Sequence, residues 1–448
     1  MAGRLRWGGR WAVSGVVAVL VALTAMLSAL AAMAGWDDES EKPDPDVRSI
    51  QRLLERRAEA VRDRDKDAYL ATVDRVASRH RTDQQRMFDD LAEVPLSSWQ
   101  YRLVRKGGFP PVVGTGRRVA VQVELSYRIK GYDTAPVVAP QRFTLVQHGH
   151  RWYVAADEVF DGEPGAAAPV ADQRDVQQLW DQGRVSVVRG RHSLVLGVGH
   201  DRRYLQDVAE TADGAVPAVQ RAWRGPWAGR VVVQVPSSLG DMAGLLGGSA
   251  SGYRGIAAVT TGEIGGSGTV PADRVIVNPD AYDVLGDLGR RVVMTHESAH
   301  VATRAHTSPS TPLWLSEGFA DWIGYRETKT YPRQVAPELT RSVESGKLPR
   351  ELPGDADFGF TGDGNVLAQA YEQGWLACRM IADQWGERKL VAFYRAVGKA
   401  PDRQGAVREA LRRELGISED EFTERWRSYL KKQLGAQAEP QPRRQQVP

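Results

Sequence analysis

The stretch MTHESAHVATRAHTSPSTPLWLSEGFAD, residues 294–321, decides how the centre of this chain folds. It holds two histidines, His296 and His300, with Glu297 directly after the first of them. Apolar residues at helical spacing precede it, which predicts a helix: Leu285, Leu288, Val292 and Val293. On a helix, positions i and i+4 lie on one face, so the two imidazoles converge on one point. This H-E-x-x-H pattern predicts a metal site, and Glu297 can reach a water held there.

A second helix is predicted at residues 314–321, after a turn that contains Pro309 and Pro312. Its sequence, WLSEGFAD, resembles the W-L-x-E-G-F-A signature of the family M1 aminopeptidases, which belong to the gluzincin zinc peptidases. The resemblance implies one Zn²⁺ per chain, with Glu317 as the third ligand beside the two histidines. It also implies that Asp321 holds a zinc-bound histidine by its other ring nitrogen. Sixteen residues separate the second histidine from Glu317, slightly fewer than in that family, so the connecting loop must differ.

A third match lies at residues 371–374, YEQG, which resembles the Y-E-K-G segment of M1-like enzymes. There, the tyrosine hydroxyl stabilises an oxyanion, so the resemblance implies this role for Tyr371. The alternative is that Tyr371 is a core aromatic residue, because it shares a helical stripe with Leu367 and Cys378. No G-A-M-E-N segment, which captures the substrate amine in M1 aminopeptidases, precedes the histidines. Exopeptidase activity is therefore not implied, and the better match is the broader group of peptidase MA-like bacterial domains.

These residues predict hydrolysis of a peptide bond by metal-activated water. Glu297 acts as the general base and Tyr371 as the oxyanion donor. Residues 255–259 are expected to form an edge strand to which an extended peptide adds. Two alternatives remain open at this point: a zinc-stabilised, membrane-anchored binding or sensor protein without catalysis, and hydrolysis of another kind of bond at the same site.

The first 36 residues predict a membrane attachment. Arg4, Arg6 and Arg10 precede an uncharged run from Trp11 to Trp36, which is long enough to span a bilayer. The basic flank predicts the N-terminus inside and the rest of the chain outside the cytoplasmic membrane. The alternative is a signal peptide cleaved after the small residues at 32–34, which would give a secreted protein.

The remaining sequence predicts an α+β protein in two globular parts, since 448 residues with 42% apolar content exceed one ordinary domain. Residues 37–46 and 161–172 have linker composition. Residues 47–160 show helical spacing and then the alternating strand 119–129, an order that weakly resembles the NTF2-like fold. Residues 173–435 form the predicted metallopeptidase domain, a small sheet followed by a helical half, and 436–448 a disordered tail. Within the predicted peptidase domain, residues 240–268 are glycine-rich and are expected to form loops.

Composition limits the partners. The formal net charge of +3 and the lack of a dense basic run argue against nucleic-acid binding. The single cysteine, Cys378, excludes an intrachain disulfide. The expected partners are therefore a peptide or protein substrate and the membrane, and the sequence leaves the oligomeric state open.

Overall fold

The computed structural model describes residues 44–108, 110–157, 177–261, 272–359 and 364–435. The predicted anchor at 1–36, most of the linker at 37–46, the linker at 161–172 and the tail at 436–448 lie outside these ranges. Within them, no helix combines the length and the apolar character that a bilayer crossing needs. The structure is a mixed α+β protein, as the sequence predicted.

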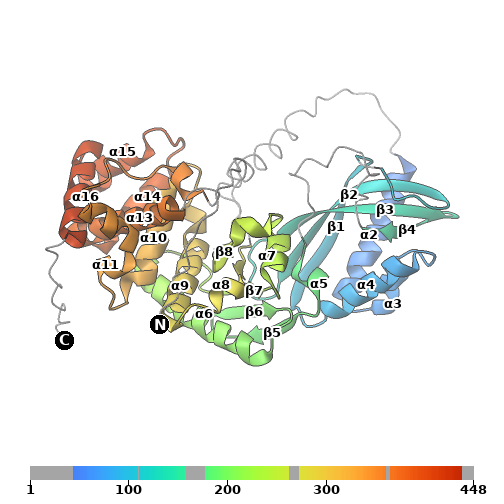
Figure 1. The fold of residues 1–448 in the computed structure, drawn as a ribbon. Coiled ribbons are helices and arrows are strands. Elements are labelled where there is room, and N and C mark those ends of the chain that lie inside the picture. The colour runs from blue at the N-terminus through green and yellow to red at the C-terminus, as the bar shows by residue number, and fades with distance from the viewer. Residues whose placement is uncertain (1–43, 109, 158–176, 262–271, 360–363, 436–448) are drawn as a thin grey trace, which may run out of the picture.

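The N-terminal part packs helices against a four-stranded antiparallel sheet in the order β1-β2-β3-β4 (Figure 1). Its elements are α2 (Pro45–Arg62), α3 (Lys66–Leu70), α4 (Ser78–Asp90), β1 (Leu96–Lys106), β2 (Arg117–Ile129), β3 (Val137–His148) and β4 (Arg151–Ala156). Helix α2 begins because Asp44 accepts a hydrogen bond from the Asp46 backbone and Pro45 stands in the first turn. Alternate residues of β2, among them Val121, Val123 and Leu125, are buried on one face.

The expected strand at residues 119–129 is confirmed. Helix α3 is short: it ends at Leu70, and the chain then turns back toward β4, where the backbone of Asp74 donates to the oxygen of Val154. Helix α4 and strand β1 are among the elements that the sequence did not predict. Helix α4 buries only Gln84 and Phe88, so it lacks the apolar stripe that marks a helix in a sequence.

The second part contains a five-stranded sheet in the order β5-β6-β7-β9-β8. Its strands are β5 (Ser186–Arg189), β6 (Ser193–Gly197), β7 (Val231–Val235), β8 (Ala258–Thr260) and β9 (Val275–Val277). The three central strands run parallel and are buried, which explains their continuous apolar sequences. Strand β8 pairs antiparallel with β9 and lies at the edge of the sheet.

Two helices and a 3₁₀ turn lie between strands of this sheet. Helix α6 (Arg202–Trp223) connects β6 to β7, and α7 (Leu239–Leu246) with η1 (Ala250–Tyr253) follows β7. The expectation of loops over residues 240–268 was therefore wrong for α7. The hydroxyl of Ser238 accepts a hydrogen bond from the Asp241 backbone and starts that helix, although glycines surround it.

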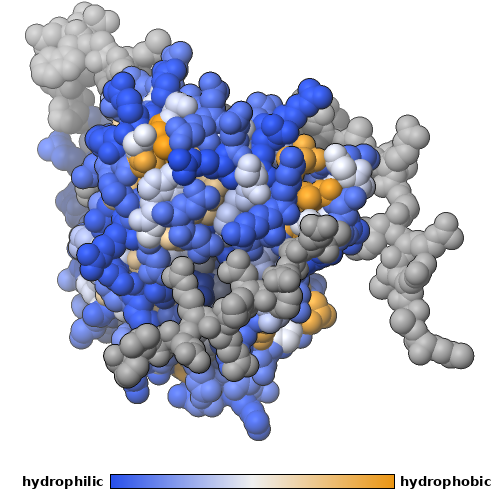
Figure 2. Space-filling model, turned by 90° about the vertical axis from the view of Figure 1, so that its left-hand side faces the viewer, coloured by the Kyte–Doolittle hydropathy of each residue, from blue (hydrophilic) through white to orange (hydrophobic). Residues whose placement is uncertain are grey.

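The C-terminal half is helical, with short irregular turns. It contains α8 (Pro279–Tyr282), α9 (Asp287–Thr303), η2 (Arg304–His306), α10 (Leu313–Arg326), α11 (Pro332–Val335), α12 (Pro337–Glu344), η3 (Asp355–Phe358), α13 (Gly364–Trp385), α14 (Glu387–Gly398), α15 (Ala406–Ala410), η4 (Leu411–Leu415) and α16 (Glu419–Leu434). Figure 2 faces this end of the molecule, whose visible described residues are mostly hydrophilic with small separate hydrophobic patches.

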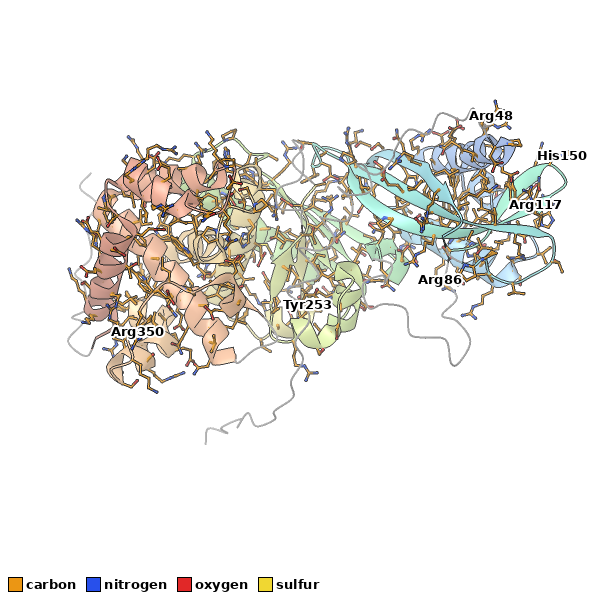
Figure 3. All side chains as sticks on the ribbon, turned by 90° about the horizontal axis from the view of Figure 1, so that it is seen from above. Arg48, Arg86, Arg117, His150, Tyr253 and Arg350 are labelled. Carbon is orange, nitrogen blue, oxygen red and sulfur yellow. The ribbon has the colours of Figure 1, made fainter. Side chains whose placement is uncertain are left out.

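The two sheets share one hydrophobic core. The indole of Trp180, on α5 (Leu179–Gln182), lies 5.4 Å from the ring of Trp99 and 5.1 Å from that of Tyr127. Leu196 and Ile276 of the second sheet belong to the same buried cluster. The molecule is elongated, with His150 at the end of the first part and Arg350 in the helical half at the other end (Figure 3). The shared core joins the first part to the middle of the molecule.

Candidate metal centre

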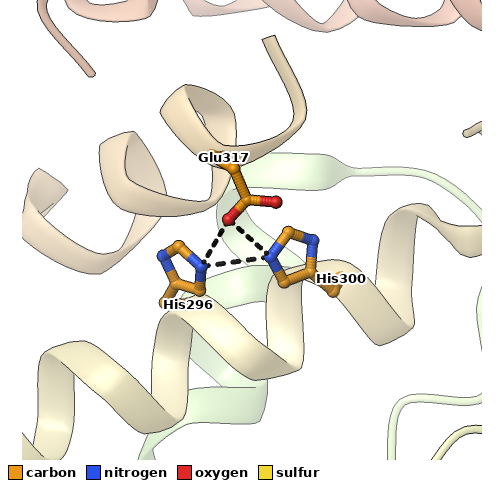
Figure 4. Close-up of side chains that lie close together, drawn as sticks. All are labelled: His296, His300 and Glu317. Atoms are coloured by element: carbon orange, nitrogen blue, oxygen red, sulfur yellow. Dashed lines mark hydrogen bonds and ion pairs between the residues drawn. The ribbon is translucent and has the colours of Figure 1, made fainter. Parts of the chain in front are cut away.

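Helices α9 and α10 bring three possible metal ligands to one point (Figure 4). His296 and His300 project from the same face of α9, and their Nε2 atoms lie 3.0 Å apart. Glu317 projects toward them from α10, with its Oε2 atom 3.2 Å from His296 Nε2 and 3.4 Å from His300 Nε2. The three side chains are 12–18% exposed, so most of the site is shielded from solvent.

These separations fit a tetrahedral zinc site. Zinc bonds to nitrogen and oxygen measure about 2.0–2.2 Å, so neighbouring ligand atoms in a tetrahedron lie about 3.3–3.6 Å apart. The observed separations of 3.0, 3.2 and 3.4 Å come close to this range. Two imidazoles and one carboxylate are also a donor set that zinc accepts, and three protein ligands leave a fourth position open.

The electrostatics around the imidazoles favour a cation. The carboxylate of Asp321 lies 2.8 Å from His296 Nδ1, so this nitrogen carries its proton toward Asp321 and presents Nε2 to the site. Burial lowers the pKa of His296, but Asp321, Glu317 and Glu297 outweigh it and raise that pKa well above its usual value. On the carboxyl of Glu317, burial acts in the opposite direction and raises the pKa. His300 and His296 together outweigh burial and lower this pKa far below its usual range. The same negative groups would stabilise a divalent ion among the three donors.

Glu297 is buried on the sheet side of α9, with 7% of its surface exposed. The hydroxyl of Thr260, at the end of the edge strand β8, lies 2.6 Å from Glu297 Oε2. Helix α9 packs directly against β8 in this region. The predicted general base therefore lies between the metal ligands and the edge strand.

Tyr371 reaches the same region from α13. Its ring centroid lies 6.5 Å from that of His296, and the ring of Phe358 packs edge-on against it at 5.2 Å. Burial first, and then Glu317, Asp321 and Glu297, raise the pKa of Tyr371 well above its usual value. The phenol therefore keeps its proton and can donate it in a hydrogen bond. The neighbouring Glu372 points elsewhere and accepts hydrogen bonds from the backbone at the start of α12.

Helices α10 and α13 cross at two glycines, one from each predicted motif. A Cβ atom on Gly318 would lie 2.2 Å from the carbonyl oxygen of Gly374. A Cβ atom on Gly374 would lie 2.6 Å from the carbonyl oxygen of Trp314. Only glycine permits backbones to approach this closely. The glycines adjacent to Glu317 and near Tyr371 thus set the distance between a metal ligand and the predicted oxyanion donor.

Buried ion pairs connect the end of α9, the helix that carries His296 and His300, to the N-terminal part. Arg304, which follows α9, donates from Nε to both carboxylate oxygens of Asp273 at 3.1 Å. The next residue, Arg274, makes two hydrogen bonds of 2.8 Å to Asp133, in the turn between β2 and β3. These four side chains are 2–8% exposed. The N-terminal sheet is therefore linked to the end of the helix that carries the histidines.

The structure brings together every site residue that the sequence singled out, and their chemical roles stay predictions. Sequence reasoning missed Thr260, because a lone threonine on a short strand carries no pattern. It also missed the contact between Asp133 and Arg274, whose residues lie 141 positions apart. Arginines and aspartates in apolar stretches of sequence indicate buried ion pairs, but the sequence does not show which arginine pairs with which aspartate.

No family model and no curated protein matches the sequence. Among solved structures, the chain is similar to native yeast LTA4 hydrolase, with 11% sequence identity and a TM-score of 0.38. The similarity covers 76% of this chain and 69% of the yeast chain.

Proposed function

We propose that this chain is a zinc-dependent peptidase of the gluzincin type, attached to the outside of the cytoplasmic membrane through residues 1–36. Residues 47–160 form an NTF2-like accessory domain in this proposal, and residues 173–435 form an M1-like or thermolysin-like peptidase domain. The observation that carries the proposal is the close approach of His296, His300 and Glu317, at 3.0–3.4 Å, from two different helices.

Bound zinc would supply Lewis acidity and lower the pKa of a water to about 7. The chain's own residues supply the rest. Glu297 accepts a proton from the attacking water and returns it to the leaving nitrogen. Tyr371 donates a hydrogen bond to the substrate's carbonyl oxygen as that oxygen becomes negative. Asp321 fixes the orientation of His296 through its Nδ1 proton.

The edge strand β8 supports a peptide as the substrate. In the antiparallel pair of β8 and β9, the backbone of Thr261 bonds to Arg274 and that of Ala257 to Asn278. Ala258 and Thr260 alternate with these residues, so their backbone groups point away from β9. Among the described strands, none pairs with this edge of β8. An extended peptide can add there by backbone hydrogen bonds, next to Glu297.

A buried carboxylate beside the donor set favours catalysis over a purely structural zinc site. Glu297 is not one of the three converging donors, and a structural ion would not require an acid at 7% exposure next to it.

The test is digestion of a peptide library by the full chain, with and without a chelator. Wild type loaded with zinc should cleave peptides, and the chelated protein should not. Replacing Glu297 by glutamine should reduce kcat by about 10²–10⁴-fold while zinc content stays at one ion per chain. A zinc-loaded wild type that cleaves no peptide would refute the peptidase and favour the binding protein.

A further inference from the structure

Thr260 contacts the predicted general base directly. Its Oγ1 atom lies 2.6 Å from Glu297 Oε2 and 3.1 Å from the Glu297 backbone oxygen. A threonine hydroxyl has one proton, and an ionised carboxylate only accepts hydrogen bonds. The hydroxyl therefore donates, and the shorter distance and the negative charge favour Oε2 as its acceptor.

The position of this hydroxyl is fixed by the structure around it. The backbone N–H of Thr261 donates to the oxygen of Arg274 at 2.8 Å, and the backbone N–H of Arg274 donates to Thr261 Oγ1 at 3.0 Å. Arg304, after the helix that carries Glu297, binds the adjacent Asp273. The end of the β8–β9 pair at Thr261 and Arg274 is therefore held against the end of α9. As a result, Thr260 cannot move far from Glu297.

From this geometry we infer that Thr260 is a positioning residue that holds the Glu297 carboxylate in the orientation needed for proton transfer. The inference rests on the proposed peptidase function. The Thr260 hydroxyl donates to Oε2, one of the two carboxylate oxygens. Oε1 is thus the oxygen left to exchange a proton with the attacking water. A glutamate side chain has several rotatable bonds, and a misplacement of about 1 Å can reduce a rate by about 10²-fold.

The backbone and the side chain of Thr260 have separate tasks in this arrangement. Its backbone groups point to the free edge of β8, where a peptide would pair, while its hydroxyl points to α9. A substitution by valine removes the hydroxyl, keeps the branched shape and leaves the backbone unchanged. We therefore expect an effect on kcat and not on KM.

The first experiment compares Thr260→Val with Thr260→Ser and with a control, Thr82→Val, on the zinc-loaded full chain. Thr260→Val should lower kcat by roughly 10–100-fold, with KM and zinc content unchanged. Thr260→Ser keeps the donor and should retain kcat within a few-fold. Thr82→Val removes an exposed hydroxyl that bonds the Ser78 backbone oxygen within α4, so it should keep the wild-type kcat. Wild-type kcat in Thr260→Val, an equal loss in Thr260→Ser, or loss of zinc would each overturn the inference.

A second readout does not depend on activity. Thermal unfolding of the zinc-free protein is measured for wild type, Thr260→Val, Glu297→Ala and the double variant. Thr260→Val should lower the unfolding midpoint by roughly 2–4 °C when Glu297 is present, and by about 1 °C or less when it has been replaced by alanine. Equal changes in both backgrounds would show that the two side chains do not interact. This result would overturn the inference about Thr260 even if the protein cleaves peptides. If the protein cleaves none, the peptidase proposal fails, and the unfolding data still report on the contact.

Discussion

Replacing Asp133 by alanine is expected to destabilise the folded chain by about 3–5 kcal/mol, because it leaves a buried charge without its partner. Asp133 accepts two hydrogen bonds of 2.8 Å from Arg274, and the two side chains are 2% and 5% exposed. Asp133 also accepts a hydrogen bond of 2.6 Å from the backbone of Ile129, so the turn between β2 and β3 loses an acceptor as well.

A matched control exists on the same sheet. Glu124 on β2 accepts two hydrogen bonds from Arg102 on β1, but these side chains are 29% and 64% exposed. Solvent screens such a pair, so Glu124→Ala should change stability by about 0–1 kcal/mol. Both substitutions remove an ion pair with two hydrogen bonds, but the pair of Asp133 is buried and Asp133 also accepts from the Ile129 backbone.

Urea unfolding followed by tryptophan fluorescence measures the difference, together with limited proteolysis to detect local opening. The double variant Asp133→Ala/Arg274→Met should recover most of the lost stability, because an apolar side chain needs no counter-charge. Equal destabilisation by Asp133→Ala and Glu124→Ala, or no recovery in the double variant, would refute the reasoning.

Three other predictions concern residues of α10 and α13. Tyr371→Phe should lower kcat by roughly 10²–10³-fold with zinc retained, as measured by steady-state kinetics and metal analysis; an unchanged kcat would make Tyr371 a packing residue only. Gly318→Ala should destabilise the fold by about 1–3 kcal/mol, because its Cβ would overlap the oxygen of Gly374. The control Gly214→Ala, in α6 with free space for a Cβ, should stabilise it by about 0.5–1 kcal/mol, and denaturant titration compares the two. Burial raises the pKa of Glu372 from 4.5 to about 7, so the folded state binds this proton more tightly and its stability should fall as pH rises from about 4.5 to 7. Glu372→Gln should show a smaller fall in unfolding midpoint over that range, and an identical fall would contradict the raised pKa.

The candidate site was predictable because most of its residues lie close together in the sequence, and helical geometry determines which side chains share a face. His296 and His300 share a helix face by their spacing, and Asp321 lies one turn after Glu317. Only the expectation that the helix of Glu317 meets the helix of the two histidines required the resemblance to known sequences. The strand at 119–129 was predictable for a similar reason, since strict alternation specifies one buried face.

The rest depended on contacts between distant residues or on weak local signals. Strand β1 contains an alternating Trp99 and Tyr101, but register shifts at both of its ends break the pattern. Thr260 gains its importance only when β8 packs on α9. The ion pair of Asp133 and Arg274 forms because two sheets meet, and no spacing rule links residues of separate sheets.

The core that both sheets share has a practical consequence for expression. A recombinant fragment that begins at α5, just before the second sheet, would leave the indole of Trp180 in water, where Trp99 and Tyr127 now cover it. It would also leave the guanidinium of Arg274 unneutralised. Such a truncation would aggregate, because a broad apolar surface would become accessible. The smallest fragment suited to crystallisation therefore begins near residue 44 and keeps both sheets.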